Sequence, residues 1–82
     1  MPTVLRIDGI RVVIYPNDHG PPHVHVIRND DEAVFLLNCP GGTVELREAY
    51  GFRRRELTSI ARVLDGHLAL LCEAWREIHG EP

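Results

Sequence analysis

The sequence contains no long hydrophobic run and no pattern of a secretory leader. No stretch approaches the ~20 apolar residues that a membrane-spanning helix requires. The N-terminal Met1-Pro2-Thr3 lacks the basic and apolar regions of a signal peptide. We therefore expect a cytoplasmic protein with no membrane-spanning segment.

Cysteine is scarce, and the chain has no excess of positive charge. Cys39 and Cys72, the only two cysteines, form no CxxC motif, so in a reducing compartment we expect free thiols. The formal net charge is -3 with neutral histidines, whereas nucleic-acid-binding domains normally carry a basic excess. Nucleic acid therefore stays open as a partner but is not favoured. Gly41-Gly42 lacks the Lys-Ser/Thr of a phosphate-binding loop, and we interpret it as a turn.

Length limits the chain to one small domain. Its 82 residues, 44% hydrophobic and 26% charged, have the composition of an ordinary globular protein. A domain of this size buries only about 60% of the surface that its unfolded chain exposes. We therefore expect a single domain over residues 1–82, with any functional site on its surface or between subunits.

Short strands separated by turn signals fill the first half of the chain. The runs Val4–Ile7 and Ile10–Tyr15 flank Asp8-Gly9, a dipeptide preferred in two-residue hairpin turns. Three further strands are predicted over residues 23–28, 33–37 and 43–47. Since no connection is long enough for a crossover helix, residues 3–47 should form an antiparallel meander of about five strands.

Helical periodicity begins near Arg53. At about 100° per residue, one side of this segment collects its apolar residues, which are Leu57, Ile60, Ala61, Leu64, Leu68, Leu71, Cys72, Trp75 and Ile78. Because the phase continues through Asp65-Gly66-His67, we predict one helix over about residues 53–79. The expected fold is α+β, an antiparallel sheet of about five strands followed by one long C-terminal helix packed on one face.

The predicted helix is longer than the predicted sheet. At 1.5 Å per residue it would extend about 40 Å, whereas strands of five or six residues span about 17–20 Å. Its distal part would need other apolar surface, and we expect a homodimer or a small protein partner to supply it. The expected interface residues are Leu68, Leu71, Trp75 and Ile78, with Val63, Leu70 and Ala74 on the flank.

Three histidines lie close together at residues 19–25. His23 and His25 are two residues apart on a predicted strand, so their side chains share one face while Val24 and Val26 face the core. With His19, they could bind zinc or a similar divalent cation and leave a fourth position for water. Such a site needs acceptors for the remaining ring N–H groups, and the candidates are Asp18, Asp30 and Glu45.

Two other interpretations of the histidines remain open. In the structural one, the imidazoles cap the proline-containing loop and bond to its backbone. In the catalytic one, His23 and His25 act as general base and general acid, because histidine titrates near neutral pH. Arginines would then hold the substrate phosphate, with Arg28, Arg47 and Arg53 to Arg55 as candidates.

The run Arg53-Arg54-Arg55 stands where the helix is expected to begin. Cations at a helix N-terminus oppose the macrodipole. Either nearby acids neutralise these arginines, or the run is an anion-binding or partner-binding patch. The nearby acids are Glu45, Glu48 and Glu56.

Several motifs together resemble the bacterial domain of unknown function 4160 family. They are Met1-Pro2-Thr3-Val4, the Asp8-Gly9 hairpin and His19-Gly20-Pro21-Pro22-His23-Val24-His25-Val26, followed by Gly51-Phe52, Arg55-Glu56-Leu57 and Trp75. The likeness covers nearly the whole chain. It implies a small prokaryotic accessory protein, often encoded beside another short protein, for which a toxin–antitoxin-type role has been suggested. Arg53 departs from the family, whose members often have Ser or another N-capping residue there, so we expect a less well capped helix start.

Two functions of different classes follow from these observations. The first is a non-enzymatic interaction module that dimerises or binds a small neighbouring-gene partner. The second is a small histidine-dependent or metal-dependent hydrolase or ribonuclease that uses His19, His23 and His25. A DNA-binding regulator gains little, because the sequence shows no helix-turn-helix pattern.

Overall fold

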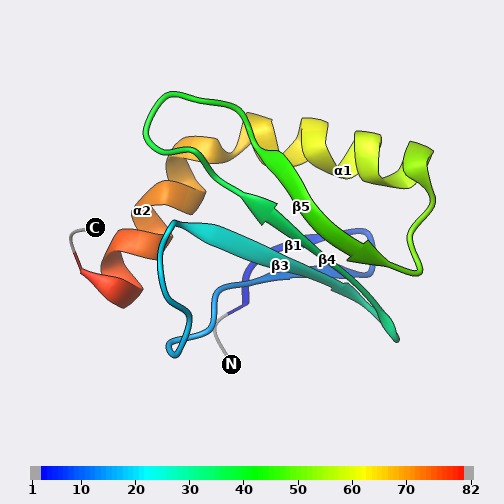
Figure 1. Cartoon of the computed structure of the whole chain (residues 1–82), viewed down its shortest axis with the longest axis horizontal. Coiled ribbons are helices and arrows are strands. Elements are labelled where there is room, and N and C mark those ends of the chain that lie inside the picture. The colour runs from blue at the N-terminus through cyan, green and yellow to red at the C-terminus, as the bar shows by residue number, and fades with distance from the viewer. Residues whose placement is uncertain (1–2, 81–82) are drawn as a thin grey trace.

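The computed structural model describes residues 3–80, which form a sheet covered on one face by helices (Figure 1). Within this range the elements are β1 (Thr3–Ile7), β2 (Ile10–Val13), β3 (His23–Arg28), β4 (Asp31–Leu36), β5 (Glu45–Tyr50), α1 (Arg54–Gly66) and α2 (Leu68–His79). The strands pair in chain order, and every pair is antiparallel. The sheet therefore agrees with the expected five-stranded meander.

Turn chemistry sets the ends of the strands. Asp8 and Gly9 have φ values of 40° and 82°, which is the positive-φ pair that a type I′ hairpin turn requires. Asn29, with φ of 52°, begins the equally short turn between β3 and β4. The last strand extends to Tyr50, beyond the predicted residue 47, because Tyr50 still pairs with Glu32 of β4.

The prediction of one long helix was wrong, because the helical segment bends at His67. This residue has φ of -118° and ψ of 18°, and its N–H bonds to Leu64 O at 2.9 Å. The apolar stripe nevertheless continues across the bend, because residues three or four apart still face the sheet. The spacing of the apolar residues therefore did not reveal the change in helix direction. This change places α2 over the end of the sheet (Figure 1).

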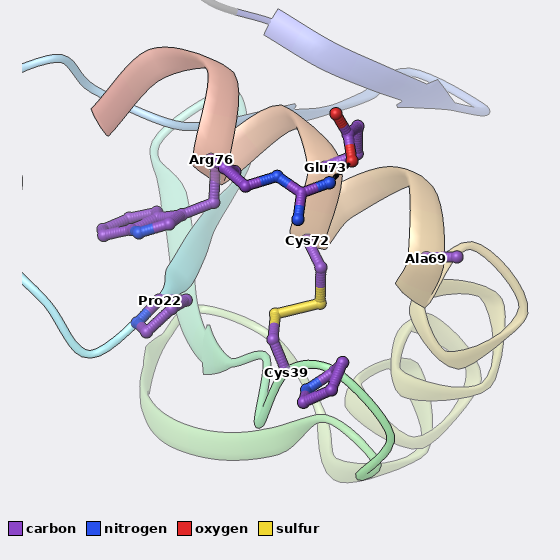
Figure 2. Close-up of a pocket in the computed structure, with 8 residues that line it drawn as sticks. Pro22, Cys39, Ala69, Cys72, Glu73 and Arg76 are labelled. Carbon is purple, nitrogen blue, oxygen red and sulfur yellow. Dashed lines mark hydrogen bonds and ion pairs between the residues drawn. A yellow bond between two sulfur atoms is a disulfide. The ribbon is translucent and has the colours of Figure 1, made fainter. Parts of the chain in front are cut away.

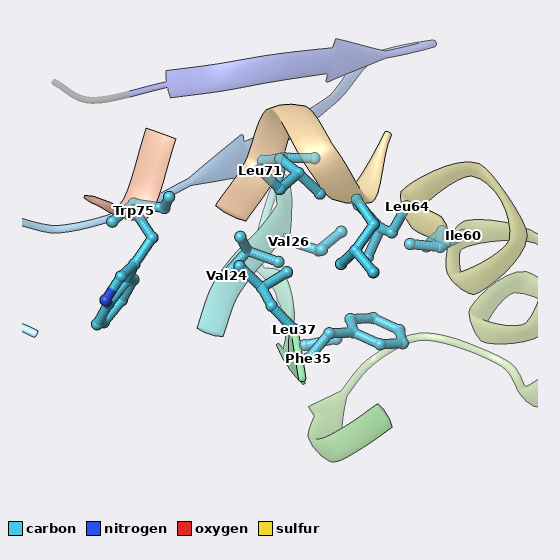
Figure 3. Packing of buried hydrophobic residues seen from close by; sticks show 12 residues of the cluster. Val24, Val26, Phe35, Leu37, Ile60, Leu64, Leu71 and Trp75 are labelled. Atoms are coloured by element: carbon cyan, nitrogen blue, oxygen red, sulfur yellow. The ribbon is translucent and has the colours of Figure 1, made fainter. Parts of the chain in front are cut away.

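A single hydrophobic core lies between the sheet and the two helices (Figure 3). The strands contribute Val12, Val24, Val26, Ala33 and Phe35, and the residues directly after β2 and β4 contribute Ile14 and Leu37. The helices contribute Ile60, Leu64, Leu68, Leu71 and Trp75. Leu68, Leu71 and Trp75 are 9%, 0% and 3% exposed within this one chain. Because of the bend, the helical segment does not extend beyond the sheet. The overhang from which we predicted a second chain is therefore absent.

The cysteines form a disulfide, so the expectation of free thiols was wrong. Cys39 and Cys72 are 33 residues apart in sequence, and their Cα atoms lie 5.9 Å apart. The bond joins the loop after β4 to α2. A second link holds the same loop, since Val44 N–H donates to Asp65 Oδ1 at 2.7 Å. The loop between β4 and β5 is therefore attached to both helices near their junction.

None of the helices within residues 3–80 is long and apolar enough to cross a membrane.

Candidate metal centre

Two histidines of β3 and one aspartate of the preceding loop converge on a common point. His23 and His25 lie on the same face of β3, while Val24 and Val26 between and beside them are fully buried in the core. The segment before β3 turns back at Tyr15 and Asp18. Asp18 N–H donates to Tyr15 O at 3.0 Å, and Tyr15 N–H donates to Asp18 Oδ2 at 3.1 Å. This double contact points the Asp18 carboxylate toward the two imidazoles.

The same carboxylate oxygen faces both rings. Asp18 Oδ2 lies 3.4 Å from His23 Nε2 and 3.2 Å from His25 Nε2. The side chains of Asp18, His23 and His25 are 17%, 9% and 16% exposed, so the cluster is largely shielded from solvent. One donor atom from each of the three residues lies within 4.8 Å of the other two.

The outer nitrogen of each imidazole is held by an acceptor. His23 Nδ1 lies 2.9 Å from Pro21 O, and His25 Nδ1 lies 3.0 Å from Glu32 Oε2. A carbonyl and an ionised carboxylate can only accept, so each Nδ1 carries the proton. Glu32 reaches His25 because it lies on β4 two residues from Val34, the residue opposite His25.

This protonation leaves the inner nitrogens facing a negative oxygen. A neutral imidazole with Nδ1–H presents a lone pair at Nε2. The Nε2 of His25 has hydrogen-bond geometry to Asp18 Oδ2 at 3.2 Å, and the Nε2 of His23 lies 3.4 Å from the same oxygen. Two arrangements relieve the repulsion: a second proton on each ring, or a cation among the three donor atoms. Metal-ligating histidines characteristically donate the other ring N–H to a carbonyl or carboxylate, as both rings do here.

Aromatic rings form the wall behind this site. The His23 ring centroid lies 5.2 Å from that of His25 and 5.2 Å from that of Trp75. Trp75 stacks on His79 at 4.0 Å, and His79 Nε2 donates to Tyr15 O at 3.1 Å. The end of α2 is thereby attached to the loop that carries Asp18, so the orientation of the ligands depends on how α2 is placed.

His19 does not join the pair as the sequence suggested. It is exposed, and it lines a surface pocket together with Asp18, Trp75 and His79. The structure brings its neighbour Asp18 to the position expected of a third ligand, although Asp18 was considered only as an outer acceptor. Glu32 was not anticipated. The only signal for it was β-strand register, since it lies two residues from Val34, which pairs with His25, and so on the same face of β4.

The arginine run lies on a different part of the surface. Arg53 occupies the N-cap position, and Arg53, Arg54 and Arg55 are exposed around a shallow depression. An arginine side chain only donates, so the helix start relies on Glu56, whose Oε1 accepts Arg53 N–H at 2.9 Å. This agrees with the expectation of a weakly capped helix start.

Arg28, a candidate for phosphate binding, is occupied within the chain. It donates to Glu56 Oε2 at 2.7 Å and to Asp31 Oδ2 at 2.8 Å, and its guanidinium lies 4.6 Å from the Phe52 ring centroid. The hydrogen bond from Arg28, followed by that from Arg53 N–H, lowers the pKa of Glu56 from 4.5 to about 2. Arg28 therefore joins β3 to α1 through this ion pair.

Comparison with known proteins gives one match. Residues 9–76 match the family described as Domain of unknown function (DUF4160). No curated protein and no solved structure matches the chain.

Proposed function

Because the chain belongs to the DUF4160 family, whose description names no activity, we propose its function from the geometry of the site. The domain binds one divalent transition-metal ion of the zinc class through His23 Nε2, His25 Nε2 and an Asp18 carboxylate oxygen. The observation that carries this proposal is that both outer ring nitrogens are already bonded to acceptors while both inner nitrogens face one carboxylate oxygen.

The donor set selects the class of metal. Two imidazoles and one carboxylate suit zinc and neighbouring divalent transition metals, whereas magnesium and calcium prefer oxygen ligands alone. A tetrahedral ion with bonds of about 2.0–2.1 Å holds its ligand atoms about 3.3 Å apart. The two separations to Asp18 Oδ2, 3.2 and 3.4 Å, match that spacing.

Charge balance supports the same assignment. The two imidazoles are neutral in the metal-ready tautomer, and the carboxylates of Asp18 and Glu32 supply two negative charges beside them. A divalent cation offsets both. It also replaces the unfavourable contact between the Nε2 lone pairs and Asp18 Oδ2 with bonds to one ion.

Titration of the metal-free protein with Zn²⁺, followed by calorimetry and native mass spectrometry, tests the proposal. We expect one ion per chain in the wild type. Asp18→Asn should weaken binding at least tenfold, while the matched neighbouring variant His19→Ala should bind like the wild type. Equal losses in both variants would restore His19 to the ligand set. Absence of a bound ion in the wild type would refute the proposal.

A hydrolytic role is a second candidate, favoured by the pocket beside Asp18. Three protein ligands leave a coordination position for water, and zinc lowers the pKa of such a water to about 7. The surface pocket lined by Asp18, His19 and His79 could admit a substrate to that position. Zinc-dependent cleavage of a short RNA that is lost in His25→Ala would support this role. Equal cleavage by the two proteins would exclude it.

The helix overhang that favoured an interaction module in the sequence is absent from the structure. Leu71 and Trp75 are covered within the chain rather than left for a partner. Leu70 is 48% exposed, and Val63, Ala74 and Ile78 are half-buried, so this part of the expected interface is still open to a second chain. The mass measured in the zinc experiment also reports the number of chains. A dimer that Leu70→Asp dissociates would renew that proposal.

A further inference from the structure

The Cys39–Cys72 disulfide lies in a surface pocket (Figure 2). This pocket shares Pro22 and Trp75 with the pocket that Asp18 of the candidate metal centre lines. Both cysteines are half-buried and line the pocket, beside Pro22, Pro40, Ala69, Glu73, Trp75 and Arg76. Glu73 and Arg76 form an ion pair on α2 at its edge. The sulfur atoms are therefore within reach of a small thiol, and two of the lining residues, Pro22 and Trp75, adjoin His23.

We infer that this disulfide is a site of reversible thiol exchange that controls metal binding at Asp18, His23 and His25. The inference rests on the metal site proposed above and adds its regulation. The oxidised form holds the ligands in place, and reduction weakens the site.

The first route from the disulfide to the site runs through α2. Trp75 lies three residues after Cys72, almost one helical turn further, and its ring packs against the ring of His23 at 5.2 Å. The disulfide fixes this turn of α2 against the loop after β4. Breaking it frees α2 to shift, and with it the wall that orients the His23 imidazole.

The second route runs through the end of β4. Leu37 N–H donates to Pro22 O at 3.0 Å, two residues before Cys39. The adjacent carbonyl, Pro21 O, accepts the Nδ1 proton of His23. The loop that the disulfide holds is thus bonded to the segment that fixes the outer nitrogen of the same ligand, so both routes converge on His23.

Reduction of the disulfide needs a small-molecule thiol as the reductant. Its thiolate attacks one sulfur, forms a mixed disulfide and displaces the other cysteine as a thiolate. A second thiol then attacks the mixed disulfide and releases the first cysteine. The protein disulfide gains two electrons and two protons and becomes two thiols, while two reductant thiols become one disulfide.

The test compares Zn²⁺ affinity, by calorimetry, in the oxidised wild type and in Cys39→Ser/Cys72→Ser. The serine variant lacks the disulfide, as the reduced protein does, but it has no thiols that would themselves bind zinc. Ile60→Val, a core substitution in α1 rather than in α2 or the disulfide-bonded loop, is the control for a general loss of stability. We expect the serine variant to bind at least tenfold more weakly, which is the typical cost of disturbing outer-shell support, and Ile60→Val to bind like the wild type.

The other possible results of this experiment refute either the control by the disulfide or the metal site itself. Equal affinity in all three proteins refutes control by the disulfide and leaves the metal site standing. Equal weakening in the serine and Ile60→Val variants refutes a specific connection. No binding in any protein refutes the proposed function itself. Should the serine variant not fold, Trp75→Phe with the disulfide intact replaces it, and unchanged affinity and unchanged imidazole NMR shifts there would refute the route through α2.

Discussion

His25 Nδ1 and Glu32 Oε2 lie 3.0 Å apart across the β3–β4 pair, while the other nitrogen of the same ring faces Asp18. The contact sets which nitrogen carries the proton. It makes Glu32 a positioning residue for the proposed metal, although Glu32 lies on β4 and the two histidine ligands lie on β3.

Replacing this carboxylate should weaken metal binding without unfolding the domain. Glu32→Gln keeps the side-chain size, and because the Glu32 side chain is 45% exposed, the fold should tolerate the change. We expect Zn²⁺ affinity to fall 10–100-fold, the usual effect of losing an outer-shell carboxylate. Calorimetric titration measures it. Glu48→Gln on exposed β5 is the control, and a wild-type affinity in Glu32→Gln would deny Glu32 this role.

Acid should weaken the fold through Glu56. Its pKa is lowered from 4.5 to about 2, chiefly by the hydrogen bond from Arg28. A lowered carboxyl pKa means that the charged form stabilises the folded state above about pH 4.5, and that this contribution is lost as the pH falls toward 2. Urea unfolding of the wild type and Glu56→Gln should therefore differ at pH 7 and converge near pH 2. A pH-independent difference would show that the ion pair does not carry the effect.

The different burial of two adjacent leucines distinguishes a helix that bends onto the sheet from one that extends beyond it. Leu71 is fully buried in the core, whereas Leu70 is 48% exposed. Leu71→Ala should lower the free energy of unfolding by about 2–5 kcal/mol, because it leaves a cavity. Leu70→Ala should change it by less than about 0.5 kcal/mol. Urea unfolding at two protein concentrations checks both values, and a similar loss for the two variants would contradict the observed packing.

Two glycines should respond in opposite directions to the same change. Gly66 ends α1, and a Cβ there would meet open space, so Gly66→Ala should stabilise the domain by up to ~1 kcal/mol. Gly51 has φ of 87°, and its Cβ would collide with the Asp31 carboxylate, which also binds Arg28. Gly51→Ala should therefore be destabilising. Thermal unfolding of both variants measures the two signs, and stabilisation by Gly51→Ala would contradict the observed turn.

Local patterns predicted the elements better than their directions. Asp8-Gly9 indicated the first hairpin because its backbone preferences act within the turn itself. The apolar stripe from Ile60 to Trp75 indicated the helix face that packs on the sheet. Its large members are buried, while Ala61 and Cys72 are half-buried beside them. The bend at His67 escaped prediction because a spacing of three or four residues places side chains on one side of both a straight and a bent helix.

By itself, the sequence determined the antiparallel meander, the buried stripe of the C-terminal segment and the shared face of His23 and His25. Each follows from interactions over a few residues, where strand and helix periods decide which way a side chain points. Only the tertiary structure decided that Asp18 rather than His19 faces this pair, that Glu32 supports His25 from the next strand, and that Cys39 reaches Cys72. These contacts depend on the path of the loops and on the bend that brings α2 onto the sheet, and neither has a period that can be read along the chain.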